Sequence, residues 1–95
     1  TQTKGEYRVG AAFNPSGNPL VDQIKRQAAD LIDLIDTVEV SADCEFLIGT
    51  HDAEVARLKA LAQTAIEDGA MWAVKAATKV PPISNVDAET QQDAA

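Results

Sequence analysis

The sequence contains few of the residues that hold small domains together through covalent or metal cross-links. Its 95 residues include a single cysteine, Cys44, which cannot form an internal disulfide. The one histidine, His51, has no second histidine and no spaced cysteines with which to ligate a metal. No apolar run approaches the roughly 18 residues that span a bilayer, and no signal-peptide pattern opens the chain. We therefore expect a cytoplasmic protein with no membrane segment, metal or cofactor.

Basic residues are also scarce. Eight Lys and Arg residues stand against fifteen Asp and Glu, which gives a net charge of −7 and a pI near 4.4. This balance argues against a DNA or RNA polymer as partner, because phosphate neutralisation needs a broad basic surface. The stretch from Leu31 to Ala56 holds seven acidic residues and no basic one. The basic residues on either side of it can therefore form local patches large enough for a small anion.

Aromatic residues make up only 4% of the chain, although 45% of its residues are hydrophobic. The apolar content is mostly Ala, Val, Ile and Leu, and small side chains allow helices to pack closely. A domain of this size buries only about 60% of its unfolded surface, so self-association is expected.

The pattern predicts two long helices. Asn18 is a good N-cap with Pro19 at the first helical position, and an apolar stripe continues to about Thr37. That stripe consists of Leu20, Ile24, Ala28, Leu31, Ile35 and Val38. A second helix should begin at a cap provided by Thr50 or Asp52 and end at Thr78 or Lys79, before two prolines.

These signals divide the chain into an N-terminal arm over 1–17, a helical hairpin domain over 18–79 and a disordered tail over 80–95. Residues 39–50 make the connection, which includes an apolar Phe46-Leu47-Ile48 cluster.

The second helix carries two apolar stripes. One comprises Val55, Leu58, Ala62, Ala65, Gly69, Trp72 and Ala76, and the other comprises Ile66, Ala70, Ala73 and Ala77. One stripe suffices to pack on the first helix, so the second implies contact with other protomers. The expected fold is all-α: an antiparallel helical hairpin with an N-terminal arm or short helix, assembling into a compact homo-oligomer.

Catalytic patterns are weak throughout. Adjacent Glu67 and Asp68 point about 100° apart on a helix, so they are more simply solvated or ion-paired than a carboxylate pair. Cys44 lies in an acidic stretch that would raise the pKa of its thiol. No phosphate-binding glycine loop occurs. Trp72 is more simply a core or interface anchor than part of a ligand site. We do not expect an enzyme.

Lys25 and Arg26 admit two interpretations. They form either a solvated face of the first helix or part of an anion site. An antiparallel hairpin brings Phe13 and this basic pair to the end that also carries Lys75 and Lys79. An aromatic ring near cations suits a phosphorylated, base-bearing ligand, since bases stack on rings and phosphates pair with Lys or Arg.

The segments "FNPSG", "AADLIDLI" and "ARLKALAQTAIEDGAMWAVKAATK" resemble the phage anti-CBASS cyclic-oligonucleotide sponges, whose helical-hairpin family also includes sponges against Thoeris defence. The resemblance covers roughly residues 7–79. It implies a homohexamer of helical hairpins that binds cyclic dinucleotides such as 3′,3′-cyclic GMP–AMP (3′,3′-cGAMP) between protomers, without cleaving them. Some members also bind cyclic trinucleotides in separate pockets. The protein would act in the cytoplasm of the infected bacterial host and keep CBASS effectors inactive.

Site residues follow from the same resemblance. It implies that Phe13 stacks on a base and that Lys25 pairs with the phosphodiester, with Asn14 and Arg26 beside them. Arg57 and Thr64 would belong to a trinucleotide site. The alternative is a structural or adaptor protein, a helical oligomer that binds a protein partner through its acidic region.

Overall fold

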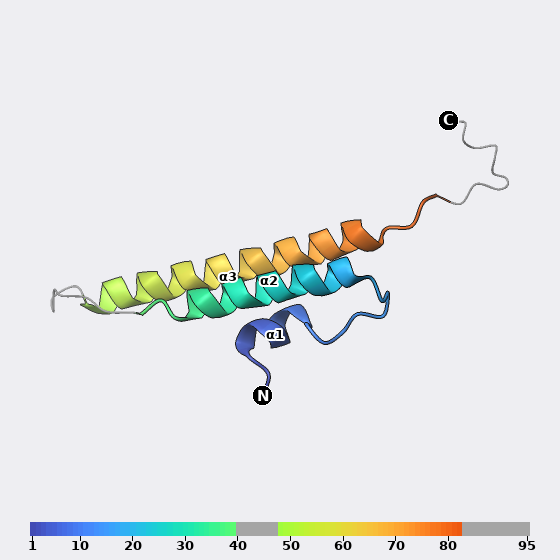
Figure 1. The fold of residues 1–95 in the computed structure, drawn as a ribbon. Coiled ribbons are helices and arrows are strands. Elements are labelled where there is room, and N and C mark those ends of the chain that lie inside the picture. The colour runs from blue at the N-terminus through green and yellow to red at the C-terminus, as the bar shows by residue number, and fades with distance from the viewer. Residues whose placement is uncertain (40–47, 83–95) are drawn as a thin grey trace.

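The computed structural model describes residues 1–39 and 48–82, which form three helices: α1 (Lys4–Val9), α2 (Pro19–Asp36) and α3 (Ile48–Thr78). α2 and α3 lie side by side and antiparallel, and α1 folds back against the hairpin (Figure 1). No strand occurs within these two ranges. The prediction of an all-α helical hairpin with a short N-terminal helix is confirmed.

The boundaries of α2 follow from its end residues, as predicted. The Asn18 side chain accepts a hydrogen bond from the Leu20 amide at 2.9 Å, and Pro19 occupies the first turn, where an amide proton would have no helical partner. At the other end, the Thr37 amide donates to the Leu34 carbonyl at 3.1 Å. The helix therefore starts and stops where local hydrogen bonds satisfy its terminal groups.

The predicted start of α3 is wrong by about one turn. α3 already begins at Ile48, so Thr50 and Asp52 lie inside the helix. Its end at Thr78, before Pro81 and Pro82, agrees with the prediction. With 31 residues against 18 in α2, α3 is about 46 Å long and extends well beyond its partner. Cys44, Phe46, Leu47 and the segment 83–95 lie outside the described residues.

The buried face of α2 is shifted by one residue from the predicted stripe. The buried residues are Val21, Lys25, Ala29 and Ile32. Three members of the predicted stripe are half-buried and three are exposed, the exposed ones being Leu20, Leu31 and Val38. The physical reason is that α2 contacts two partners, α1 and α3, so its most buried line faces the junction between them. The sequence stripe anticipated only α3.

α3 turns one of its two stripes toward α2. Ala70 is buried, and Ile66, Ala73 and Ala77 are half-buried. The C-terminal part of the other stripe is exposed, including Trp72 at 58%. Trp72 is therefore not a core anchor of the single chain. No helix in the described part of the chain is long and apolar enough to cross a membrane.

Candidate functional site

The segment between α1 and α2 is folded tightly against the start of α2. The side-chain Nδ2 of Asn14 donates to the Asn18 carbonyl at 2.9 Å and to Asp22 Oδ1 at 3.0 Å. The Ser16 hydroxyl donates to Asn14 Oδ1 and accepts from the Asn18 amide. Gly17 completes the turn with a φ of 70°, a conformation that glycine adopts without strain. This network fixes the backbone that carries Phe13.

Lys25 of α2 holds the same segment by hydrogen bonds to its backbone. Its side chain projects from the buried face of α2, and the residue is only 9% exposed. The Nζ group donates to the Gly10 carbonyl at 3.1 Å and to the Phe13 carbonyl. The interpretation of Lys25 as part of a solvated face is therefore wrong. An ammonium group has three donors, and contacts among the described residues use two of them, which leaves one for a further acceptor.

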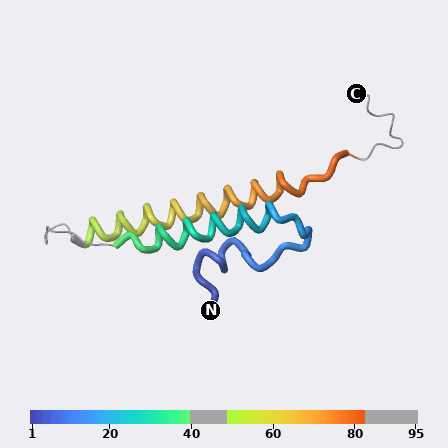
Figure 2. Tube along the Cα trace, viewed as in Figure 1, coloured from blue at the N-terminus to red at the C-terminus, as the bar shows by residue number. Residues whose placement is uncertain are grey.

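Phe13 presents its ring at the surface, 68% exposed, with Lys25 Nζ 5.5 Å from the ring centroid. A cavity of about 270 Å³ lies here, lined by Phe13, Asn14 and Lys25 together with Val74 and Thr78 of α3. We call it the Phe13 cavity. Figure 2 shows that the segment before α2 lies at the end of the hairpin where α3 finishes. The structure thus brings three predicted site residues together.

A second cavity, of about 400 Å³, lies between α1 and α3, and we call it the Arg8 pocket. Lys25 and Val74 line both cavities, so the two adjoin at these residues. Arg8 enters from α1, and its Nε donates to Glu67 Oε1 at 2.8 Å. Thr64 also lines this pocket and accepts a bond from Arg8 at 3.3 Å.

The other predicted residues lie elsewhere. Arg26 is beside Lys25 in sequence but pairs with Glu6 and Asp30, and it lines neither of these cavities. Arg57 pairs with Glu54 on the exposed surface of α3. It does not line the Arg8 pocket, which Thr64 does. Lys75 lies over the Trp72 ring, with Nζ 5.6 Å from its centroid. No cluster that could hold a metal occurs among the residues described.

Polar contacts attach α1 to the hairpin. Lys4 donates to Asp36 at 2.9 Å, the Gly5 amide donates to Asp33 at 2.7 Å, and Arg26 donates to Glu6 at 2.8 Å. α1 leads directly into the segment that carries Gly10 and Phe13. These contacts therefore fix the position of that segment relative to Lys25.

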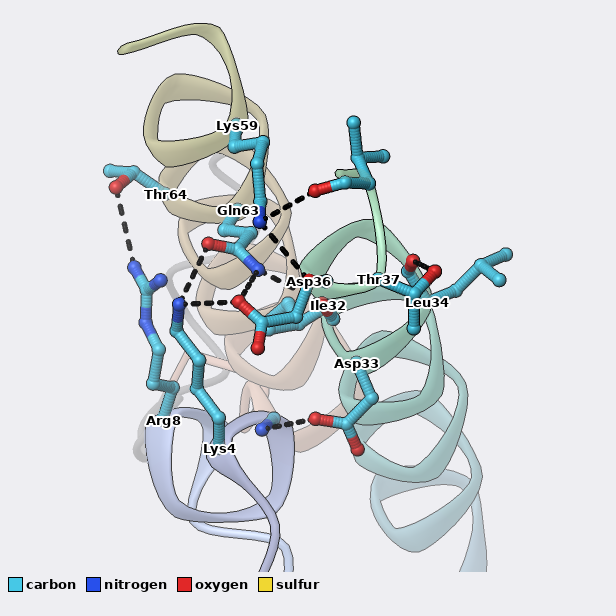
Figure 3. Close-up of polar contacts among 12 residues, drawn as sticks. Lys4, Arg8, Ile32, Asp33, Leu34, Asp36, Thr37, Lys59, Gln63 and Thr64 are labelled. Atoms are coloured by element: carbon cyan, nitrogen blue, oxygen red, sulfur yellow. Dashed lines mark hydrogen bonds and ion pairs between the residues drawn. The ribbon is translucent and has the colours of Figure 1, made fainter. Parts of the chain in front are cut away.

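A buried amide ties the three helices together, as Figure 3 shows. Gln63 of α3 is 2% exposed, and its Nε2 donates to the Ile32 carbonyl at 3.0 Å and to Asp36 Oδ1 at 3.2 Å. Its Oε1 accepts from Lys4 at 3.0 Å. Both ends of the amide are therefore satisfied, which offsets the cost of burying it.

The contacts of α1 should weaken in acid. The pKa of Glu6 is lowered by the Thr3 amide and then by Arg26, and the pKa of Asp36 is lowered by Lys4 and then by Gln63. A carboxylate with a lowered folded pKa stabilises the fold above its unfolded value, and that contribution is lost as the pH falls through the folded pKa. The protection of α1 amides against hydrogen exchange should therefore decrease below about pH 4.5, before that of α2.

A matched pair of variants checks this prediction. Glu6→Gln should lower α1 protection at neutral pH and reduce its dependence on acid. Glu54→Gln removes another carboxylate whose pKa an arginine lowers, but that pair lies within α3 and should leave α1 unaffected. Protection of α1 that stays constant from neutral pH to pH 3 would contradict this account.

Sequence reasoning missed one contact in the site and one contact that positions α1 beside it. Arg8 and Glu67 are 59 residues apart, and no local pattern links them. Gly5 packs against the backbone of Ala29, where an added Cβ would lie 2.8 Å from the Ala29 carbonyl carbon. A glycine in a short polar helix is the one local signal of such a close approach.

The helical hairpin thus carries an exposed aromatic ring beside a buried ammonium group, an arrangement that can accept a small anionic ligand with an aromatic base. A family model for the Acb2/Tad1 hairpin domain matches residues 6–78, and the chain belongs to that family. The predicted resemblance is therefore confirmed. The family is one of phage sponges for cyclic nucleotides, binding proteins rather than enzymes. Comparisons with curated proteins and with solved structures gave no match.

Proposed function

We propose that this protein captures cyclic dinucleotides such as 3′,3′-cGAMP in the host cytoplasm, without cleaving them, and thereby keeps CBASS effectors inactive. Phe13 stacks on one base of the ligand, and Lys25 pairs with a phosphodiester. Family membership gives the class of ligand, and the two residues supply the chemistry that such a ligand needs.

The arrangement of Phe13 and Lys25 carries the proposal. The ring is exposed and available for stacking, and the ammonium group lies 5.5 Å from its centroid. Base stacking on an aromatic side chain contributes about 1–3 kcal/mol, and a charge-assisted bond to phosphate adds to it. Because Lys25 is held by two backbone carbonyls, little side-chain entropy is lost when the ligand binds.

The protein acts as a homo-oligomer, a hexamer as the family resemblance implies, with a neighbouring protomer completing each pocket. Exposed apolar side chains support this part of the proposal. They include Leu31, Leu34, Leu58, Leu61, Met71 and Trp72. So many large exposed apolar side chains on one small chain are typical of a protein that associates with other chains. Gly69 is exposed, and no described residue places an atom within 4 Å of a Cβ built there, so the backbone of another protomer has room to approach it.

A separate site for cyclic trinucleotides is also part of the proposal. Arg57 and Thr64 are seven positions apart on α3, a spacing that places both on one side of the helix. A second protomer would have to bring further groups to them.

Thermal unfolding with a panel of cyclic dinucleotides, cyclic trinucleotides and linear mononucleotides tests the proposal. A ligand that binds the folded state raises stability by RT ln(1 + [L]/Kd), about 2.7 kcal/mol at 100 times Kd. We expect the cyclic compounds, led by 3′,3′-cGAMP, to raise the melting temperature and the linear ones to have little effect. No shift with any cyclic compound would contradict the proposal and favour an adaptor that binds a protein partner.

A further inference from the structure

The Arg8 pocket differs in charge from the Phe13 cavity. It contains two carboxylates, Glu67 and Asp68, beside the cations Arg8 and Lys25. Arg8 is already paired with Glu67, and Lys25 lies at the border with the Phe13 cavity, which it also lines. A phosphate placed deep in this pocket would approach two carboxylates, and the arginine that could offset their charge is already paired with Glu67, so the pocket suits an uncharged group.

The shape and walls of the pocket suit a nucleobase. Its volume of about 400 Å³ lies within the usual range for small-molecule sites. Ala70, Met71 and Val74 of α3 line it together with Val9 of α1, which makes the walls apolar around a polar edge. A thioether such as that of Met71 makes favourable contacts with aromatic rings.

We propose that the Arg8 pocket binds the guanine base of a cyclic dinucleotide, an inference that rests on the proposed function. The Glu67 carboxylate accepts the two adjacent guanine donors, N1–H and the N2 amino group, and Arg8 donates to O6. Adenine instead presents an unprotonated N1, an acceptor, where guanine carries a donor. A carboxylate therefore repels that position in adenine, so Glu67 selects guanine.

The position of Lys25 connects this pocket to the rest of the ligand. Because Lys25 lines both cavities, a phosphodiester bound to it can carry one base into the Arg8 pocket and direct the other toward Phe13. Stacking on Phe13 accepts either base, since every base has an aromatic face. Selectivity therefore resides in the Arg8 pocket, and a ligand with one guanine satisfies both positions.

Titration calorimetry with 3′,3′-cGAMP and 3′,3′-cyclic di-AMP tests the inference, because the two differ in one base. The wild-type protein should bind 3′,3′-cGAMP at least about tenfold more tightly, the discrimination expected of a two-point contact to a base edge. Glu67→Gln should bring the ratio close to one by weakening 3′,3′-cGAMP alone. Glu54→Gln, which removes an arginine-paired carboxylate of α3 outside the pocket, should leave the ratio unchanged.

The outcomes separate the inference from the proposed function. If Glu67→Gln weakens both ligands equally, Glu67 acts by holding Arg8 and α1, and guanine selection is wrong. Equal affinities in the wild type, or a preference for cyclic di-AMP, would overturn the inference while leaving the proposed function intact. If neither compound binds the wild type, the proposed function fails and guanine recognition fails with it.

Discussion

Lys25→Met should weaken the binding of 3′,3′-cGAMP by about 100-fold, the upper range for the loss of one hydrogen bond to a charged group. Methionine retains most of the aliphatic stem, so the packing of α2 changes little. The ammonium group is lost, and with it the contact to the phosphodiester. The bonds to the Gly10 and Phe13 carbonyls are lost as well, so the backbone at Phe13 is held less firmly, by hydrogen bonds such as those of Asn14 and Ser16. Calorimetry on the two proteins gives the ratio directly.

Lys59→Met is the matched control. Lys59 also donates to two backbone carbonyls, those of Asp36 and Val38, at 3.1 and 2.9 Å. It lines neither the Phe13 cavity nor the Arg8 pocket. Its substitution should remove a comparable pair of contacts and leave nucleotide affinity unchanged. An unchanged affinity in Lys25→Met, or an equal loss in Lys59→Met, would show that Lys25 is not the phosphate-binding cation.

Gly5→Ala should destabilise the fold by about 3 kcal/mol, the size expected when a rigid contact is overfilled. An added Cβ would lie 2.8 and 2.9 Å from the carbonyl carbon and Cα of Ala29. These are backbone atoms within α2, so they cannot rotate away as a side chain could. α1 would have to move, which would break the Gly5 contact to Asp33 and displace Gly10 from Lys25. Urea unfolding at a fixed protein concentration measures the loss.

Gly49→Ala provides the control, because no atom of the described residues lies within 4 Å of a Cβ at that exposed position in α3. Alanine is the better helix former, so this variant should be as stable as the wild type or slightly more stable. Hydrogen exchange should also show loss of α1 protection in Gly5→Ala alone. A Gly5→Ala protein with unchanged stability and a protected α1 would contradict the docking of α1 described here.

The ends of the long helices were predictable because they depend on neighbouring residues. Asn18 and Pro19 mark the start of α2 through one side-chain bond and one missing donor. The prolines after Thr78 likewise limit α3. The start of α3 was missed because Thr50 and Asp52 are good caps by residue type, whereas the helix continues upstream of them to Ile48.

The packing of α1 could not be predicted, since six residues are too few to show a helical period. Its contacts join residues that are distant in sequence, such as Lys4 with Asp36 and Arg8 with Glu67. The one-residue error in the buried face of α2 has the same origin. The apolar stripe was interpreted with α3 as the sole partner of α2. The contact with α1 shifts the buried face of α2 by one residue, and the stripe does not show this.

The candidate site divides in a similar way. Phe13, Asn14 and Lys25 were named from the sequence, and the structure gathers them around one cavity. Arg26 was named with them, but it faces Glu6 and Asp30. Consecutive residues on a helix point about 100° apart, so the two members of the basic pair lie on different sides of α2 in the single chain. The burial of Lys25 was not predictable, because it depends on backbone carbonyls that only the folded segment presents.

A sponge of this kind holds a cyclic dinucleotide and releases it unchanged. The most direct measurement incubates the protein with an equimolar amount of 3′,3′-cGAMP, removes unbound nucleotide by filtration, denatures the protein and identifies what is released. We expect the nucleotide to stay with the folded protein and to be recovered intact. Recovery of linear dinucleotide, or passage of all the nucleotide through the filter, would contradict it.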